Sequence, residues 1–160
     1  SMIFVKIFTT MTKKMFIIMA AVLMSISTLF ADNDLVINPS ELPSKASEFI
    51  STYFADNEIT FAKLDKDIFE NRYEVRLSNG VELVFFKSGD WKEIDAEGAT
   101  VTFEMPEELI PVQIRQYVET VYAGSKIKSI EKEGRFTDIN LRNGLELRFD
   151  SSYKLVEIDD

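Results

Sequence analysis

A nine-residue pattern occurs twice in this chain and constrains its fold more than any other feature. Residues 77–85 read LSNGVELVF, and residues 141–149, 64 positions later, read LRNGLELRF. Asn-Gly between alternating apolar residues is typical of a β-hairpin, because the turn needs a positive φ that glycine adopts without a steric penalty. The pattern therefore predicts two equivalent hairpins.

The side chains of the first hairpin favour one register. A two-residue loop would place Arg76 opposite Leu83, so charged and apolar residues would face each other across the strands. A three-residue loop with Gly80 in the left-handed position instead pairs Val75 with Leu83. Arg76 then pairs with Glu82, so one face of the hairpin is apolar and the other carries an ion pair. The second hairpin predicts the same register.

An amphipathic helix is expected before each hairpin. The apolar residues of the first helix follow the spacing of one helix face, and they are Ala46, Phe49, Ile50, Tyr53 and Phe54. The spacing returns 68 positions later in Ile114, Tyr117, Val118, Val121 and Tyr122. A proline stands near the start of each helix, where its missing N–H has no intrahelical partner to lose.

The whole order of elements is repeated. One strand follows each helix and another follows each hairpin, and these strands are expected at residues 58–64, 91–95, 126–132 and 155–159. A linker, residues 96–105, joins a first repeat at 41–95 to a second at 106–160. We therefore predict an α+β fold, in which tandem helix-plus-four-strand repeats form one antiparallel sheet with the helices packed on one face.

The first 31 residues have the composition of an export signal. They contain three basic residues, no acidic residue and an apolar stretch at positions 15–30 behind two lysines. This stretch is short for a transmembrane helix, and Ala31 is a suitable small residue before a cleavage site. We expect a signal peptide at 1–31 and a polar lead-in at 32–40, the alternative being an uncleaved membrane anchor. The mature protein is then periplasmic or secreted, without a stable membrane anchor.

The remainder of the chain is acidic. All 27 acidic residues but only 15 of the 18 basic residues lie beyond residue 31, which gives this part a net charge of −12. Nucleic acid and anionic membrane surfaces are poor partners for it, because phosphate groups bind to basic faces. The chain has no cysteine, so its fold depends on the burial of apolar side chains and not on disulfides.

The residue types leave little scope for catalysis. Histidine and cysteine are absent, which excludes a His-dependent serine triad, a cysteine nucleophile and the usual zinc sites. Acidic pairs at 32–34, 65–67 and 159–160 could donate oxygen atoms to calcium, but none has the glycine and distant glutamate of a calcium loop. We therefore expect a non-enzymatic protein with no cofactor and no metal site.

Taken together, the motifs resemble the PepSY-like family related to β-lactamase-inhibitor proteins. The resemblance lies in the aromatic helix around Tyr53, in YEVRLSNG at 73–80 and in Gly89-x-Trp91, and it covers about residues 40–160. It implies an exported protein of tandem helix-and-sheet repeats, with a sheet face that grips a partner protein in the inhibitors. The chain departs from those inhibitors, which use disulfides, and its second repeat lacks the Gly-x-Trp motif.

Alternation along the strands predicts a partly apolar sheet face on the side away from the helices. If Ile94 points toward the helices, pairing across the turn at 88–90 places Trp91 on the opposite face. The residues expected to bind a partner on that face are Arg76, Val84, Phe86, Trp91, Phe136, Arg148, Tyr153 and Leu155. Aromatic and arginine side chains are typical of protein interfaces.

Two functions fit this reading. The favoured one is an exported non-enzymatic binding module, including an inhibitor, that recognises a protein or peptide through the open sheet face. The alternative is a periplasmic carrier of a small ligand, or an envelope stress component, with a pocket between helices and sheet. The open face also has two other candidate occupants, the linker at 96–105 and a second copy in a homodimer.

Overall fold

In the computed structural model, the described residues 34–67 and 69–160 contain a helix followed by four strands twice. The first half has α2 (Ser44–Tyr53), β2 (Ile59–Lys66), β3 (Asn71–Leu77), β4 (Glu82–Phe86) and β5 (Trp91–Asp95). The second half has α3 (Val112–Val121), β6 (Ile127–Glu133), β7 (Phe136–Leu141), β8 (Glu146–Phe149) and β9 (Leu155–Asp159). The signal peptide expected at 1–31 lies outside the described residues.

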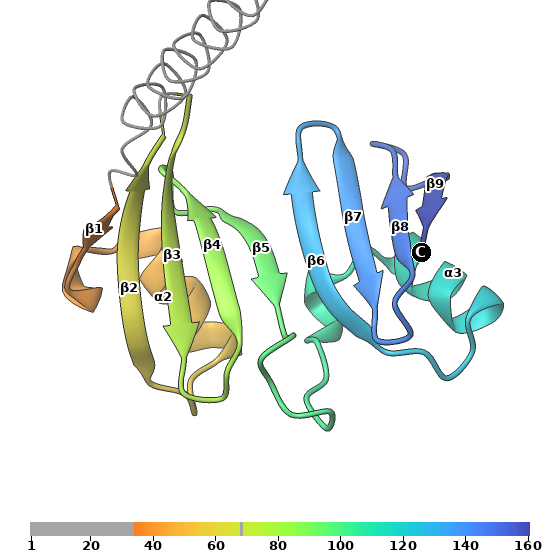
Figure 1. Ribbon diagram of the computed structural model, residues 1–160, viewed down its shortest axis with the longest axis horizontal. Coiled ribbons are helices and arrows are strands. Elements are labelled where there is room, and N and C mark those ends of the chain that lie inside the picture. Colours follow the sequence, from red (N-terminus) through yellow and green to blue (C-terminus); the bar gives the residue numbers. More distant parts are fainter. Residues whose placement is uncertain (1–33, 68) are drawn as a thin grey trace, which may run out of the picture. The chain divides into compact units, whose positions relative to one another are not determined.

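The strands form one antiparallel sheet whose spatial order follows the chain from β1 to β9 (Figure 1). The edge strand β1 (Leu35–Val36) comes from the segment expected to be a polar lead-in, and it pairs with β2. Strand β5 pairs with β6 and thereby joins the two halves. The α+β fold predicted from the sequence is therefore confirmed.

Both hairpins have the predicted register. Val75 lies beside Leu83, and Ile139 lies beside Leu147. The backbone φ is 86° at Gly80 and 98° at Gly144, in the left-handed region that favours glycine. Each three-residue loop thus brings the apolar residues of its hairpin onto one face.

The core lies between that face and the two helices. A row of aliphatic side chains crosses the sheet without any exposure to solvent, formed by Leu83, Ile94, Ile130, Ile139 and Leu147. Helix α2 buries Ala46 and Ile50, and α3 buries Ile114 and Val118. Both helices lie behind the sheet in the view of Figure 1, so the other face of the sheet carries no helix among the described residues.

The linker packs on the helix side. The ring of Phe103 stacks on that of Phe54, at the end of α2, with the ring centres 6.4 Å apart. Met105 is buried in the same core, followed by a short 3₁₀ turn at Glu107–Leu109. The linker therefore does not cover the open face, and this candidate occupant is excluded.

Candidate functional site: the open face of the sheet

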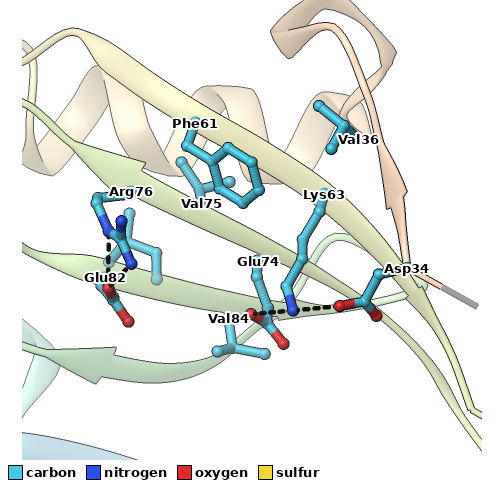
Figure 2. Close-up of a pocket in the computed structure, with 10 residues that line it drawn as sticks. Asp34, Val36, Phe61, Lys63, Glu74, Val75, Arg76, Glu82 and Val84 are labelled. Atoms are coloured by element: carbon cyan, nitrogen blue, oxygen red, sulfur yellow. Dashed lines mark hydrogen bonds and ion pairs between the residues drawn. The ribbon is translucent and has the colours of Figure 1, made fainter. Parts of the chain in front are cut away.

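The open face has a hollow of about 350 Å³ over strands β1 to β4 (Figure 2). Its apolar lining comes from Val36, Phe61 and Val84, which belong to β1, β2 and β4. The strand register places these side chains together, because Val36 lies beside Lys63 and Phe61 lies beside Arg76. In β2, Phe61 and Lys63 flank the buried Ala62 and therefore point to the open face. The hollow is thus a product of four strands and not of one motif.

The charged residues around the hollow are paired with one another. Lys63 Nζ lies 2.7 Å from Asp34 Oδ2 and 3.1 Å from Glu74 Oε2, as Figure 2 shows. The hydrogen bond to Asp34, supported by that to Glu74, raises the pKa of Lys63, so this ammonium stays charged. On the same rim, Arg76 Nη2 lies 2.6 Å from Glu82 Oε1. The hollow is therefore an apolar depression whose rim carries two basic and three acidic side chains, all of them paired.

The second half contributes a separate aromatic site to the same face. The guanidinium carbon of Arg148 lies 5.3 Å from the centre of the Phe136 ring. Arg148 also donates two hydrogen bonds of 2.7 Å to the buried carboxylate of Asp138. These bonds raise the pKa of Arg148 and hold its guanidinium plane over the ring.

Acidic side chains meet at the centre of the open face, where β5 joins β6. Glu93 lies beside Glu131, and Lys92 forms an ion pair with Glu131. Burial raises the pKa of Glu93 to about 7, and the negative charges of Glu131 and Asp95 add to this effect. The carboxyl group of Glu93, at the centre of the face, therefore changes its protonation state near neutral pH.

Trp91 is not on the open face, contrary to the prediction from alternation. It pairs with Phe85, and its ring centre lies 6.2 Å from that of Phe49 in α2. A β-bulge is the reason: Lys92 and Glu93 both lie opposite Val84, and the extra residue reverses the alternation. The indole therefore packs on the helix side.

The same correction applies to Leu155, and Tyr153 lies on neither face. A bulge in β9 pairs Leu155 with Phe149, on the helix side. Tyr153 is in the preceding turn with a φ of 58°. Five of the eight expected residues remain on the open face, and they are Arg76, Val84, Phe86, Phe136 and Arg148.

The part of the hollow that β1 and β2 form was not identified from the sequence. Phe61 and Lys63 follow the alternating pattern of β2, but a bulge between Ile59 and Phe61 shifts that pattern by one residue, so their face could not be assigned by alternation from Ile59. Strand β1 is only two residues long, too short for any periodic pattern to predict. Among the described residues no group of three or more acidic side chains is placed to hold a metal ion, and no helix is long and apolar enough to cross a membrane.

Three solved structures share this fold along nearly their whole length. A "putative periplasmic protein" of Bacteroides vulgatus is 35% identical, with a TM-score of 0.75, over 81% of this chain and 99% of that chain. A "putative calcium-regulated periplasmic protein" of Bacteroides thetaiotaomicron is 33% identical, with a TM-score of 0.74, over 80% and 98%. A second Bacteroides vulgatus protein, "of unknown function", is 32% identical, with a TM-score of 0.74, over 80% and 100%.

These relatives confirm the localisation predicted for the chain, periplasmic or secreted. The search of functionally curated proteins gives no match. The family profile described as "Putative beta-lactamase-inhibitor-like, PepSY-like" matches the chain twice, at residues 30–87 and 71–157. The chain therefore belongs to the PepSY-like family that its motifs resemble.

Proposed function

We propose that this protein is an exported, non-enzymatic binding module that recognises a protein or peptide through the open face of its sheet. One observation carries the proposal: the helices and the linker cover one face, while the other face has a hollow lined by apolar side chains. Phe61, in that lining, leaves 39% of its surface exposed. An apolar depression on an otherwise polar surface is typical of a protein-interaction site.

The chemistry of the hollow indicates how a partner would bind. Because Lys63 and Arg76 are already paired with carboxylates, the rim offers little net charge to a ligand. A partner would therefore insert an apolar side chain against Phe61 and Val84 and form hydrogen bonds with the rim. The inhibitor-like description of the family supports inhibition of a partner enzyme as one use of this surface.

The space between helices and sheet gives less support to the carrier alternative. The Phe49 ring lies 5.6 Å from that of Phe85, edge to face, and the Tyr117 ring lies 5.6 Å from that of Phe149 in the same geometry. These rings fill the space between each helix and the strands that it covers. A hollow beside α3, lined by Val118 and Ile127 among others, has a volume of only about 150 Å³, which is small for a ligand pocket of about 300 Å³ or more.

The test is capture of a partner from a periplasmic extract with the wild-type protein and with Phe61→Ala. Val112→Ala is the matched control, because Val112 is a similarly exposed apolar residue on the outer side of α3. We expect the wild type and the control to retain the same partner. Phe61→Ala should weaken the binding free energy by about 2 kcal/mol, which is in the range of interface hot spots.

Binding of the captured partner should then be measured with the purified proteins. A partner that binds Phe61→Ala as tightly as the wild type would place recognition on another surface. The homodimer remains a prediction, and sedimentation over a range of protein concentrations tests it. A dimer that persists in Phe61→Ala would not use the hollow.

A further inference from the structure

Strand β9 is the counterpart of β5, position by position. Leu83 pairs with Ile94 in the first half, and Leu147 pairs with Ile158 in the second. Each strand has a bulge at the same place, with Lys92 and Val156 as the extra residues. The strand that pairs with the outer edge of β5 therefore shows the backbone pairing that the outer edge of β9 can accept.

The two strands differ in what lies beside them. Strand β6 covers the edge of β5, so Ile94 packs beside Ile130 and is fully buried. No strand among the described residues covers the outer edge of β9, and Ile158 leaves 49% of its surface exposed. At the other end of the sheet, β1 already occupies the edge of β2.

The backbone of β9 directs hydrogen-bonding groups toward this edge, although the N–H of Asp160, just beyond the strand, already donates to Asp159 Oδ1. In the first half, Ala96 N–H donates to the Lys128 carbonyl oxygen across the junction with β6. Because N–H groups alternate in direction along an antiparallel strand, the N–H of Ile94 also points toward β6. By the equivalence of the two strands, the N–H of Ile158 points away from β8. An exposed edge of this kind pairs readily with an added strand.

The side chains indicate the chemistry of that strand. On β5, the neighbour β6 places Ile130 beside Ile94, but it sets Ser129 beside Asp95 and Glu131, which has the same charge, beside Glu93. Strand β6 therefore shows the apolar part of the match and not the best charge match. On β9, the residues flanking Ile158 are Glu157 and Asp159, both exposed and both acidic. Basic residues beside an aliphatic one would complement them.

We propose that the outer edge of β9 binds an extended segment of another protein as an additional antiparallel strand. That segment carries an aliphatic residue beside Ile158 and lysine or arginine residues on either side of it. A second copy of this chain fits less well, because antiparallel pairing of two β9 strands about Ile158 would set Glu157 of each beside Asp159 of the other. This edge is separate from the hollow, so either proposal can fail without the other.

The probe is a synthetic peptide based on residues 126–133, KIKSIEKE, with lysine in place of Ser129 and Glu131, so that basic residues flank the isoleucine equivalent to Ile130. The unchanged peptide, which would set a glutamate beside Glu157, is the control and should bind less tightly. The probe is titrated to about 1 mM, the range of weak binding, into the ¹⁵N-labelled protein, and the amide NMR signals are followed. We expect shifts concentrated in β8 and β9, and at least a tenfold loss of affinity in Ile158→Pro, which removes the outward N–H. Proline is tolerated there because edge strands accept it when the N–H faces solvent.

Two further comparisons distinguish a loss of binding from misfolding of the Ile158→Pro variant. A peptide with proline in place of the residue equivalent to Ile130 leaves the protein unchanged and should not bind. Asp159→Lys should weaken binding severalfold, whereas Glu119→Lys, the same charge change on the exposed side of α3, should not. Absence of shifts in β9, or shifts confined to β2–β4, would overturn the proposal. So would a dimer that Ile158→Pro converts to monomer, because the occupant would then be a second copy.

Discussion

The ammonium nitrogen of Lys132 lies 3.4 Å from the centre of the Trp91 ring. Lys132 is in β6 and Trp91 is in β5, so this cation–π contact connects the two halves of the protein on the helix side of the sheet. Burial lowers the pKa of Lys132, although Asp90 partly opposes this effect. The contact, together with packing against Phe49, makes Trp91 part of the joint between the halves.

Trp91→Ala should therefore destabilise the fold. We expect the free energy of unfolding in urea to fall by about 3 kcal/mol, because the change removes a large ring packed against α2. Phe86→Ala is the matched control on the open face and should cost about 1 kcal/mol or less. Equal losses for the two variants would contradict the assignment of their side chains to opposite faces.

The two hairpin glycines should respond differently to the same substitution. Both have a positive φ, so valine at either position adds backbone strain of about 1–3 kcal/mol. A Cβ on Gly80 would also lie 2.2 Å from the carbonyl oxygen of Gly98, whereas a Cβ on Gly144 would have no other atom within 4 Å. Gly80→Val should thus lower the unfolding midpoint more than Gly144→Val. A larger effect at Gly144 would contradict the packing of the first hairpin against the linker.

Glu93 should make stability depend on pH. Its pKa is about 7 in the folded protein against an ordinary value of 4.5, so the folded state binds the proton more tightly than the unfolded chain. The free energy of unfolding should therefore fall as pH rises from about 4.5 to about 7. Glu93→Gln should remove this dependence and be more stable than the wild type at pH 8, by about 1 kcal/mol after solvent screening.

Urea unfolding at pH 4 and pH 8 checks this prediction. At pH 4 the wild type and Glu93→Gln should be equally stable, because the wild-type carboxyl group is then protonated. The control is Glu146→Gln, an exposed position on the same face, whose stability should follow the wild type at both pH values. A variant that gained no stability at pH 8 would show that Glu93 is solvated.

Two arginines on the open face should differ in their contribution to stability. Arg148→Met leaves the buried carboxylate of Asp138 without its hydrogen-bond donor and should cost about 3 kcal/mol. Arg76→Met breaks an ion pair in which both side chains are more than half exposed, and it should cost less than about 1 kcal/mol. Thermal and urea unfolding of both variants measure the difference. Similar losses would indicate that Asp138 is hydrated.

The hairpins and their registers could be predicted because the information is local. Only one pairing of residues 73–77 with residues 81–85 places six apolar side chains together on one face, and the Asn-Gly loop supports that pairing. These side chains are Tyr73, Val75, Leu77, Val81, Leu83 and Phe85. The helices were predictable for the same reason, since their apolar faces are contiguous in the sequence. Two hairpins, each preceded by an amphipathic helix, together indicate an antiparallel sheet with helices on one face.

The faces of Trp91 and Leu155 could not be predicted in the same way. A bulge adds one residue to a strand, and the alternation beyond it is reversed. Nothing in the residue types of Lys92 or Val156 marks them as bulge positions. The acidic centre at Glu93 and Glu131 was also missed, because it depends on which strands meet at the junction of the halves and not on any spacing within one of them.

The buried row that runs from Leu83 through Ile94 and Ile130 to Leu147 has a consequence for how the protein folds. Because the row continues across the junction of β5 and β6, neither half contains a complete hydrophobic core. The first half expressed alone would leave Ile94 beside water, as Ile158 is in the intact protein. We therefore expect the first half alone to be less stable than the same residues are in the intact protein, because Ile94 would no longer be buried.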